Sequence, residues 1–184
     1  VLLNPANEEL PFPLILTGPK SSAEYFKHIH HFIEMTLGFE AQQRYKIIID
    51  DPALVAREMK NGMESVKEFR RANSDAYYYN WILQVDNEFQ NPFIPSHENM
   101  AKLEIHSDME NHHLAANLRR AFSGIVAGNV KEEGVRAIEE HGLFEIRGEK
   151  KIMKPLDDLL ESFVQQNRMK LPGSKYTPCY KVVT

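Results

Sequence analysis

The clearest signal of the fold is the stretch Tyr45-Lys46-Ile47-Ile48-Ile49-Asp50-Asp51-Pro52. Its apolar, β-branched run predicts a strand that is buried on most of its surface. Asp51 followed by Pro52 is the N-cap and N1 pair that begins a helix, and the apolar spacing continues this helix to about Arg70. A strand that leads directly into a helix is typical of a parallel α/β sheet.

The same order of elements occurs immediately before this stretch. Pro13-Leu14-Ile15-Leu16 predicts a buried strand that ends at Gly18-Pro19. Ser21-Ser22-Ala23-Glu24 has the spacing of a capping box, which begins a helix that Gly38 ends. This succession predicts that residues 1–75 are the C-terminal part of a doubly wound, Rossmann-like domain with a parallel sheet.

Residues 76–184 are expected to form a second domain, of the α+β class. The expected elements are strands at 76–85, 103–105 and 180–183, a hairpin across 144–152, and helices at 112–127, at 131–141 and from Pro155 onward. Gly128 and Gly142 are expected to end the first two of these helices. The overall expectation is therefore an α/β fold followed by an α+β domain.

The composition is that of an ordinary globular protein and narrows the choice of functions. The 184 residues are 42% hydrophobic and 26% charged, and no window approaches the roughly 18 apolar residues of a membrane-spanning helix. The single cysteine, Cys179, excludes an intrachain disulfide and a CxxC motif. With 22 basic against 26 acidic side chains, the net charge of −4 disfavours a nucleic-acid partner. We expect a cytoplasmic protein with no membrane contact.

Arg70 and Arg71 are the first candidate binding residues. They end a predicted helix, and an aromatic segment that contains Tyr77, Tyr78 and Tyr79 follows them. Guanidinium groups bind phosphate through paired hydrogen bonds, and aromatic rings stack on bases, so the combination fits a nucleotide site. The alternative is that both arginines only complement the dipole at the C-terminal end of the helix.

A second set of candidates is polar and lies in the predicted second domain. His97, Glu98 and Asn99 combine an imidazole that titrates near neutral pH with a carboxylate and an amide. The alternative is that Ser96 and its neighbours only cap a turn. Asn129 and Lys131 follow a helix end rich in small residues, where tight helix packing is the favoured explanation for Gly124.

Other titratable residues have structural explanations that we favour. Asp50 and Asp51 come at the carboxyl end of a strand, where open α/β sheets bind ligands, but Asp51 is a sufficient N-cap. The histidines at 28, 30, 31, 112 and 113 lack the spacing of a zinc motif, and we expect the adjacent pair at 112 and 113 to point in different directions. We expect neither a metal nor a cofactor.

Several long segments of the chain resemble one known family. These segments are LNPAN (3–7), PLILTGP (13–19), RYKIIIDD (44–51), RRANSDAYYYNW (70–81), PSHENM (95–100), LRRAFSGIVAGNVKEEGVRAIEEHG (118–142) and RMKLPGSKYTPCY (168–180). In this order and spacing they are similar to the C-terminal portion of the bacterial nucleotide monophosphate nucleosidases, a branch of the LOG (lysine-decarboxylase-like) Rossmann family. The resemblance covers essentially the whole chain.

The resemblance implies an enzyme that acts on nucleoside monophosphates. It implies a cytosolic homo-oligomer, such as a tetramer, that cleaves the N-glycosidic bond to give a free base and ribose phosphate. It also implies control by guanosine tetra- and pentaphosphate. Arg70, Arg71 and the tyrosines at 77–79 would then contribute to the alarmone site, and His97, Glu98, Asn99, Asn129 and Lys131 could face the nucleotide cleft.

One feature of that family does not occur in these 184 residues. Its catalytic signature, PGGxGTxxE, holds the phosphate on backbone amides and supplies a glutamate beside the sugar. Residues 1–7 are expected to be a helix end and a loop, which indicates a cut inside a larger α/β fold. We therefore expect the chain to be inactive alone and to need the N-terminal part of the parent protein. The alternative function is a non-catalytic nucleotide-binding or oligomerisation module.

Overall fold

A computed structural model describes residues 1–73, 83–171 and 175–183. Its strands are β1 (Ile15–Gly18), β2 (Lys46–Ile49), β3 (Glu104–Ile105), β4 (Phe144–Gly148) and β5 (Tyr180–Val183). Its helices are α1 (Ala23–Leu37), α2 (Phe39–Gln42), α3 (Pro52–Ala72), α4 (Asn87–Gln90), α5 (His97–Ala101), α6 (Asn111–Val130), α7 (Glu132–His141) and α8 (Lys150–Gln165), with 3-10 turns at η1 (Pro5–Asn7) and η2 (Lys20–Ser22).

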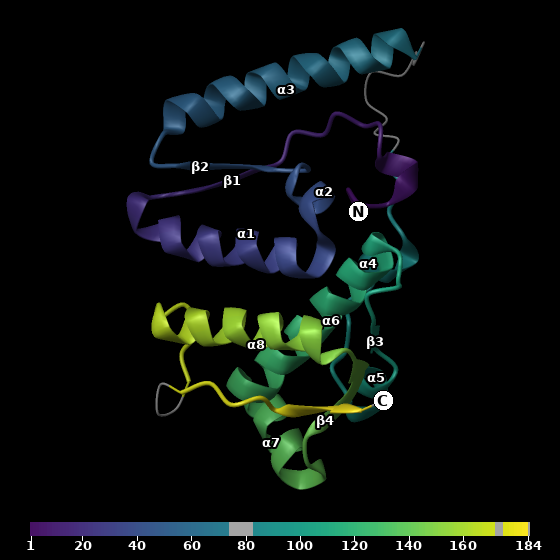
Figure 1. Ribbon diagram of the computed structural model, residues 1–184, viewed down its shortest axis with the longest axis vertical. Coiled ribbons are helices and arrows are strands. Elements are labelled where there is room, and N and C mark those ends of the chain that lie inside the picture. Colours follow the sequence, from purple (N-terminus) through teal and green to yellow (C-terminus); the bar gives the residue numbers. More distant parts are fainter. Residues whose placement is uncertain (74–82, 172–174, 184) are drawn as a thin grey trace.

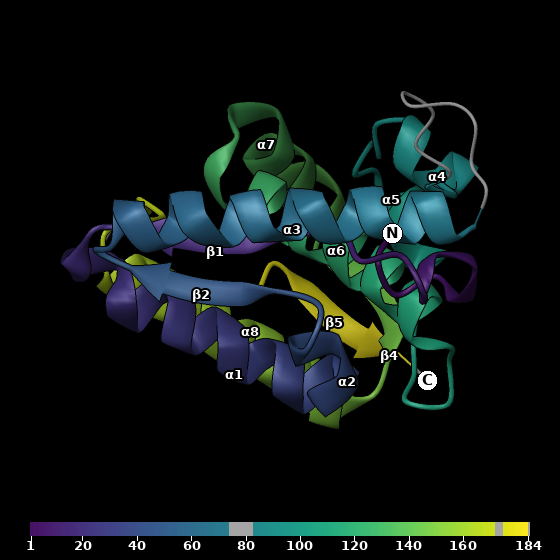
Figure 2. The same cartoon turned by 90° about the horizontal axis from the view of Figure 1, so that it is seen from above.

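The first half is a three-layer arrangement around a parallel pair of strands. β1 and β2 pair from Ile15↔Lys46 to Gly18↔Ile49. α3 covers one face of this pair and α1 covers the other, as in a doubly wound sheet (Figures 1 and 2). Because the described sheet has only two strands, each strand has an open edge. Among the described residues of β1 and β2, only Ile48 is buried. The expectation of strands buried on most of their surface was wrong for the described residues.

The second half also has a parallel sheet, with the strand order β3-β4-β5. The predicted hairpin across 144–152 was therefore wrong. After β4, the Glu149 N–H donates to the Ile105 carbonyl at 2.9 Å, and α8 begins at Lys150, with Pro155 inside it. The predicted α/β class is confirmed. Helices also alternate with parallel strands in the second half, where an α+β arrangement was expected.

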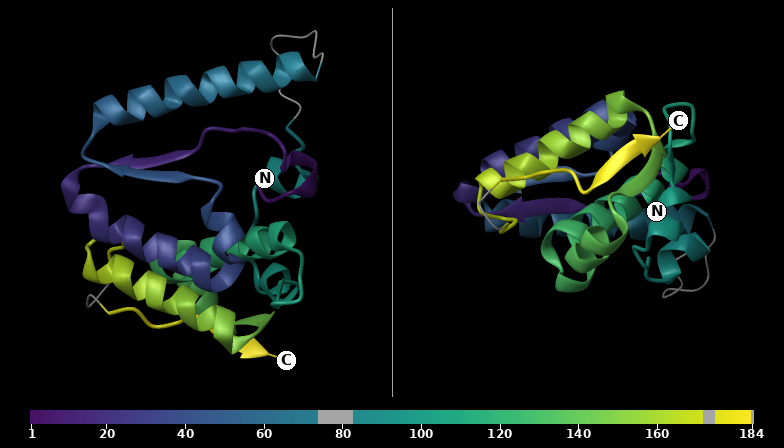
Figure 3. Two further views of the ribbon diagram at one scale, coloured as in Figure 1. Left: turned by 45° about the horizontal axis from the view of Figure 1, so that its top comes forward. Right: turned by 90° about the horizontal axis from the view of Figure 1, so that it is seen from below.

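One hydrophobic core joins the two halves. Its fully buried centre lies among α5, β4, α6 and α8, and includes Met100, Ile125, Phe144, Ile146, Leu156 and Leu160. α1 packs along α8, with the rings of Tyr25 and Phe163 centred 5.0 Å apart (Figures 1 and 3). Helix α1 of the first half therefore rests on a helix of the second half.

Several predicted boundaries differ from the structure. The capping box was wrong, because Ser22 ends η2 and its hydroxyl bonds to Arg168 instead of capping α1. Gly128 lies inside α6, where a Cβ would come within 2.7 Å of the Cys179 sulfur. Residues 83–85 belong to no strand, and the rest of the aromatic strand predicted at 76–85 lies outside the described residues. Gly38 and Gly142 end α1 and α7 as predicted, with φ values of 81° and 82°.

Candidate functional site

The carboxyl ends of β1 and β2 form the edge at which sheets of this kind bind ligands. The Asp50 N–H donates to the Gly18 carbonyl at 2.9 Å, so the two strand ends lie side by side. Asp51 Oδ1 accepts from the Leu54 N–H at 2.8 Å, which confirms the predicted N-cap of α3. Asp50 is exposed and has φ +58°, a conformation that is uncommon outside glycine. Among the described residues, this carboxyl edge carries two exposed carboxylates, of which that of Asp51 caps α3.

Arg168 also lies beside the carboxyl edge, and no sequence pattern singled it out. Its Nη2 donates to Ser22 Oγ at 3.0 Å, and its guanidinium carbon lies 4.1 Å from the centre of the Tyr25 ring. Ser22 in turn lies next to Gly18, because a Cβ on that glycine would be 3.1 Å from the serine side chain. The segment after α8 thus places a cation near the end of β1.

Arg70 and Arg71 lie at the opposite end of α3. Arg70 is half-buried and Arg71 is exposed, in the last turn of the helix. A helix of 21 residues is about 30 Å long, so these arginines are far from Asp51 at its start. The pKa of Glu64 is lowered, chiefly by its hydrogen bond and charge pairing with Lys67 and more weakly by the charge of Arg71. Tyr77, Tyr78 and Tyr79 lie outside the described residues.

The N-terminal segment forms hydrogen bonds with residues 84–86. Asn7 is fully buried, and its amide group donates to the Val1 and Gln84 carbonyls at 2.9 and 2.8 Å. Its Oδ1 accepts from the Gln84 N–H at 2.8 Å, and Asn4 donates to the Asp86 carboxylate at 3.2 Å. Gln84 and Asp86, which follow residues 74–82 in the chain, are therefore held by the N-terminal segment.

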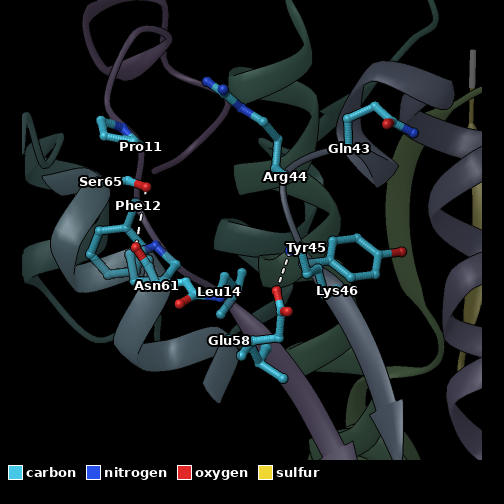
Figure 4. A pocket seen from close by; sticks show the side chains of 13 residues that line it. Pro11, Phe12, Leu14, Gln43, Arg44, Tyr45, Lys46, Glu58, Asn61 and Ser65 are labelled. Atoms are coloured by element: carbon cyan, nitrogen blue, oxygen red, sulfur yellow. Dashed lines mark hydrogen bonds and ion pairs between the residues drawn. The ribbon is translucent and has the colours of Figure 1, made fainter. Parts of the chain in front are cut away.

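A pocket of about 240 Å³ lies at the amino ends of β1 and β2, beneath α3 (Figure 4). Its cations already have partners in the chain. Arg44 donates to the Leu2 and Glu8 carbonyls at 3.0 and 2.8 Å, and Lys46 pairs with Glu58. The pocket is at the end of the sheet opposite to the carboxyl edge, and it contains none of the predicted site residues.

His97, Glu98 and Asn99 make local contacts at the start of α5. Ser96 Oγ accepts from the Asn99 N–H at 3.1 Å, so the alternative of a capped turn is confirmed. Asn99 donates to the Ile94 carbonyl at 2.9 Å, and Glu98 pairs with Lys102. The Nε2 of His97 lies 2.8 Å from the Gly142 carbonyl, with its ring 4.7 Å from that of Phe144.

Asn129 and Lys131 lie at the other end of α7 from this group. Asn129 donates to the Ile125 carbonyl at 2.9 Å, and exposed Lys131 is the residue between α6 and α7. Since α7 has 10 residues and is about 15 Å long, His97 and Lys131 are not brought together. Gly124 has the packing role expected of it, because a Cβ there would lie 2.3 Å from the Met100 sulfur.

The histidines behave differently from one another. His28 and His31 line an open groove of about 400 Å³ between α1 and α8, while His30 Nδ1 lies 2.9 Å from the Tyr45 hydroxyl. The ring centres of His112 and His113 lie 3.9 Å apart, with the ring planes tilted by 36°, so the expectation that the two side chains diverge was wrong. With Glu110, their ligand atoms lie within 4.8 Å of one another.

A half-buried carboxylate ties α8 to β5. Asp157 accepts from the hydroxyls of Tyr176 and Tyr180 at 2.7 and 2.9 Å. Burial raises the pKa of Asp157, and the two hydrogen bonds oppose that rise. Nearby, burial raises the pKa of the Cys179 thiol to about 11. Among the described residues this group lies away from the carboxyl edge and serves the packing of the C-terminal strand.

Comparison with known proteins decides the family. A family model described as pyrimidine/purine nucleotide monophosphate nucleosidase, C-terminal, matches residues 63–183. The chain belongs to this family. The matched region begins within α3 and includes the whole of the second half, so Arg70, Arg71 and Arg168 all lie inside the family's C-terminal unit.

Curated relatives extend the similarity to the full chain. Pyrimidine/purine nucleotide 5'-monophosphate nucleosidases from Escherichia coli strains K12, CFT073 (O6:H1) and O157:H7 are each 58% identical to it over 184 residues. The match covers 100% of this chain and 40% of each relative, in the C-terminal part. Among the described residues, every helix is too short or too polar to span a bilayer.

Proposed function

We propose that this chain acts within an enzyme that hydrolyses the N-glycosidic bond of nucleoside monophosphates, giving a free base and ribose 5-phosphate. The observation that carries the proposal is the 58% identity over all 184 residues to proteins named for this nucleosidase activity. A parallel sheet with helices on both faces and an accessible carboxyl edge supports it, since such edges bind nucleotides.

The catalytic groups are proposed to come from outside these residues. PGGxGTxxE does not occur in the 184 residues, and the chain spans 40% of the length of its curated relatives. The isolated chain should therefore release no free base from GMP, whereas the full-length protein should. Base release by the chain alone, above that of a mock preparation, would contradict the proposal that the catalytic groups lie outside these 184 residues. A full-length protein that binds nucleotides without turnover would favour the alternative of a non-catalytic module.

Regulation by guanosine tetra- or pentaphosphate is proposed at Arg70 and Arg71, with Tyr77, Tyr78 and Tyr79 as candidates for base contact. The position of the arginines supports a regulatory role, because the length of α3 separates them from the carboxyl edge. An exposed arginine at a helix end can pair with phosphate oxygens, and binding there could bias the second half of the chain relative to the sheet.

Calorimetry on the full-length protein tests this site. Each arginine–phosphate contact contributes about 1.5–3 kcal/mol, so Arg71→Ala should weaken alarmone binding by roughly one to two decades while unliganded turnover stays near wild type. Arg57→Ala is the matched control, since Arg57 is an exposed arginine near the start of the same helix. Unchanged affinity in the Arg70→Ala/Arg71→Ala double variant would leave the pair as cations at a helix end.

Assembly and the division of the chain are also proposed. Residues 1–75 would complete the nucleotide-binding domain and 76–184 would serve regulation and assembly in a cytoplasmic homo-oligomer. The open edges of the β1–β2 pair support association, because unpaired strand edges favour added partners. Light scattering should show a species larger than a monomer for the chain. A monodisperse monomer with one cooperative melt would contradict it.

The polar residues of the second half remain candidates for the cleft in the assembled enzyme. The contacts of His97 with Gly142 and Phe144 support a packing role within one chain. If a neighbouring subunit presents His97, Glu98, Asn99, Asn129 or Lys131 to substrate, His97→Ala should alter kinetics more than stability. A lower melting temperature with unchanged kinetics would assign His97 to packing.

A further inference from the structure

Arg168 is an exposed cation at the end of the sheet where nucleotides are proposed to bind. It follows α8, whose C-terminal end lies on the same side of the molecule as the carboxyl ends of β1 and β2 (Figure 1). Ser22 links the two, since its side chain would lie 3.1 Å from a Cβ added at Gly18, at the end of β1, and its Oγ accepts from the Arg168 guanidinium. The second half thus supplies a charged group to the ligand edge of the first half.

The backbone that carries Arg168 is held in one conformation. Asn167 has φ +55°, and the Asn167 N–H donates to the Val164 carbonyl at 3.0 Å. The Arg168 N–H donates to the Phe163 carbonyl at 2.8 Å, and Met169 is buried directly after it. This helix ending resembles a Schellman motif, which reverses the chain sharply. The side chain therefore starts from a fixed point.

The guanidinium is also oriented. One face stacks on Tyr25 at 4.1 Å, and Nη2 donates to Ser22 at 3.0 Å. An exposed arginine normally keeps its rotamer freedom, and a ligand that binds it must pay for the side-chain entropy that is lost on ordering. Of the five N–H donors of arginine, one is used by Ser22 among the described residues. The result is a pre-oriented cation with donors available to a ligand.

We propose that Arg168 adds a charged side-chain contact to the phosphate group of the nucleoside monophosphate, beside the backbone amides of the PGGxGTxxE segment, and so strengthens the selection of nucleotides over nucleosides. This inference rests on the proposed nucleosidase function. A planar guanidinium matches phosphate oxygens in geometry and charge, and Tyr25 and Ser22 hold it in the orientation for that contact. Phosphate recognition by this residue would make the substrate site dependent on the C-terminal half of the chain.

The competing explanation is that Arg168 only ties α1 to α8. Both explanations predict some loss of stability on substitution, because the contacts with Tyr25 and Ser22 disappear in either case. They differ in substrate dependence. If Arg168 only ties α1 to α8, its substitution should affect GMP and guanosine equally. If Arg168 binds the phosphate group, its substitution should affect only the nucleotide.

The test uses the full-length protein with Arg168→Gln and Arg168→Lys variants. Arg168→Gln should raise KM for GMP tenfold or more with a smaller change in kcat, and it should leave any residual activity on guanosine unchanged. Arg168→Lys should recover part of the lost affinity for GMP, because lysine keeps the positive charge but lacks the paired N–H donors of the guanidinium. Arg136→Gln is the control, since Arg136 is exposed on α7 and pairs with Glu132; it should leave KM unchanged.

A binding measurement separates this inference from the proposed function. Calorimetry with ribose 5-phosphate should give at least tenfold weaker binding to Arg168→Gln than to wild type, whether or not the protein releases base. Absence of base release by wild type would refute the function alone. Wild-type binding of ribose 5-phosphate by Arg168→Gln, or no binding by either protein, would overturn the role of Arg168. A lower melting temperature with unchanged KM would do so as well.

Discussion

Asn7 is expected to be one of the most sensitive polar positions in the chain. Asn7→Ala removes three hydrogen bonds of 2.8–2.9 Å from a side chain that is fully buried. The Gln84 N–H and the Gln84 and Val1 carbonyls then lose this partner. The substitution changes no charge, so the effect reports the hydrogen bonds and the volume of the amide.

The magnitude follows from the number of bonds. At about 0.5–1.5 kcal/mol for each of the three bonds, the expected loss is about 1.5–4.5 kcal/mol. That is a large part of the 5–15 kcal/mol typical of a domain. Unfolding of the wild-type and variant chains in urea or guanidinium, monitored by circular dichroism, measures the difference in the free energy of unfolding, provided that the two chains have the same m-value.

The control is Asn61→Ala, because Asn61 is exposed on α3. Surface substitutions of this kind usually change the free energy of unfolding by less than about 0.5 kcal/mol. An Asn7→Ala loss as small as that of the control would refute the idea that Asn7 holds the segment around Gln84. In full-length protein, Asn7→Ala should also weaken alarmone binding without touching the ligand.

Three further predictions concern the second half. Gly134→Ala should destabilise the protein by about 1–3 kcal/mol in thermal melts, and by more than Gly124→Ala. A Cβ at Gly134 would lie 2.3 Å from the backbone oxygen of Ala127, whereas a Cβ at Gly124 would meet the flexible side chain of Met100. The Cys179 thiol, with a pKa of about 11, should be roughly a thousandth ionised at pH 8, so iodoacetamide should label native protein far more slowly than unfolded protein; equal rates would contradict the burial. The folded-state pKa of Asp157 is raised above its ordinary value of 3.8. The protonated Asp157 therefore adds to the free energy of unfolding at pH below 3.8, and this addition is lost as the pH rises through the folded-state pKa. The stability of wild type relative to Asp157→Asn should therefore fall over that acidic interval, and a constant difference would contradict the raised pKa.

Local signals in the sequence predicted the elements that local physics decides. Asp51-Pro52 begins α3 because the cap and its N–H partner are three residues apart. Gly38 and Gly142 end helices because glycine adopts positive φ without strain. In contrast, the hairpin at 144–152 was wrong, because the pairing of β4 depends on strands far from it in sequence.

The site contacts were harder to predict for the same reason. Asn7 and Gln84 are 77 residues apart, and Arg168 and Ser22 are 146 residues apart. No periodicity links such residues, and their importance follows only from burial and orientation in the fold. Arg70 and Arg71 could be chosen from the sequence because charge, helix end and aromatic neighbours coincide there.

Product analysis tests the central claim most directly. Full-length protein incubated with GMP should yield guanine and ribose 5-phosphate in equal amounts, identified by chromatography and mass spectrometry, because the bond broken is the N-glycosidic bond. Guanosine with inorganic phosphate would show cleavage of the phosphate ester instead. That product pair, or unchanged GMP, would contradict the account.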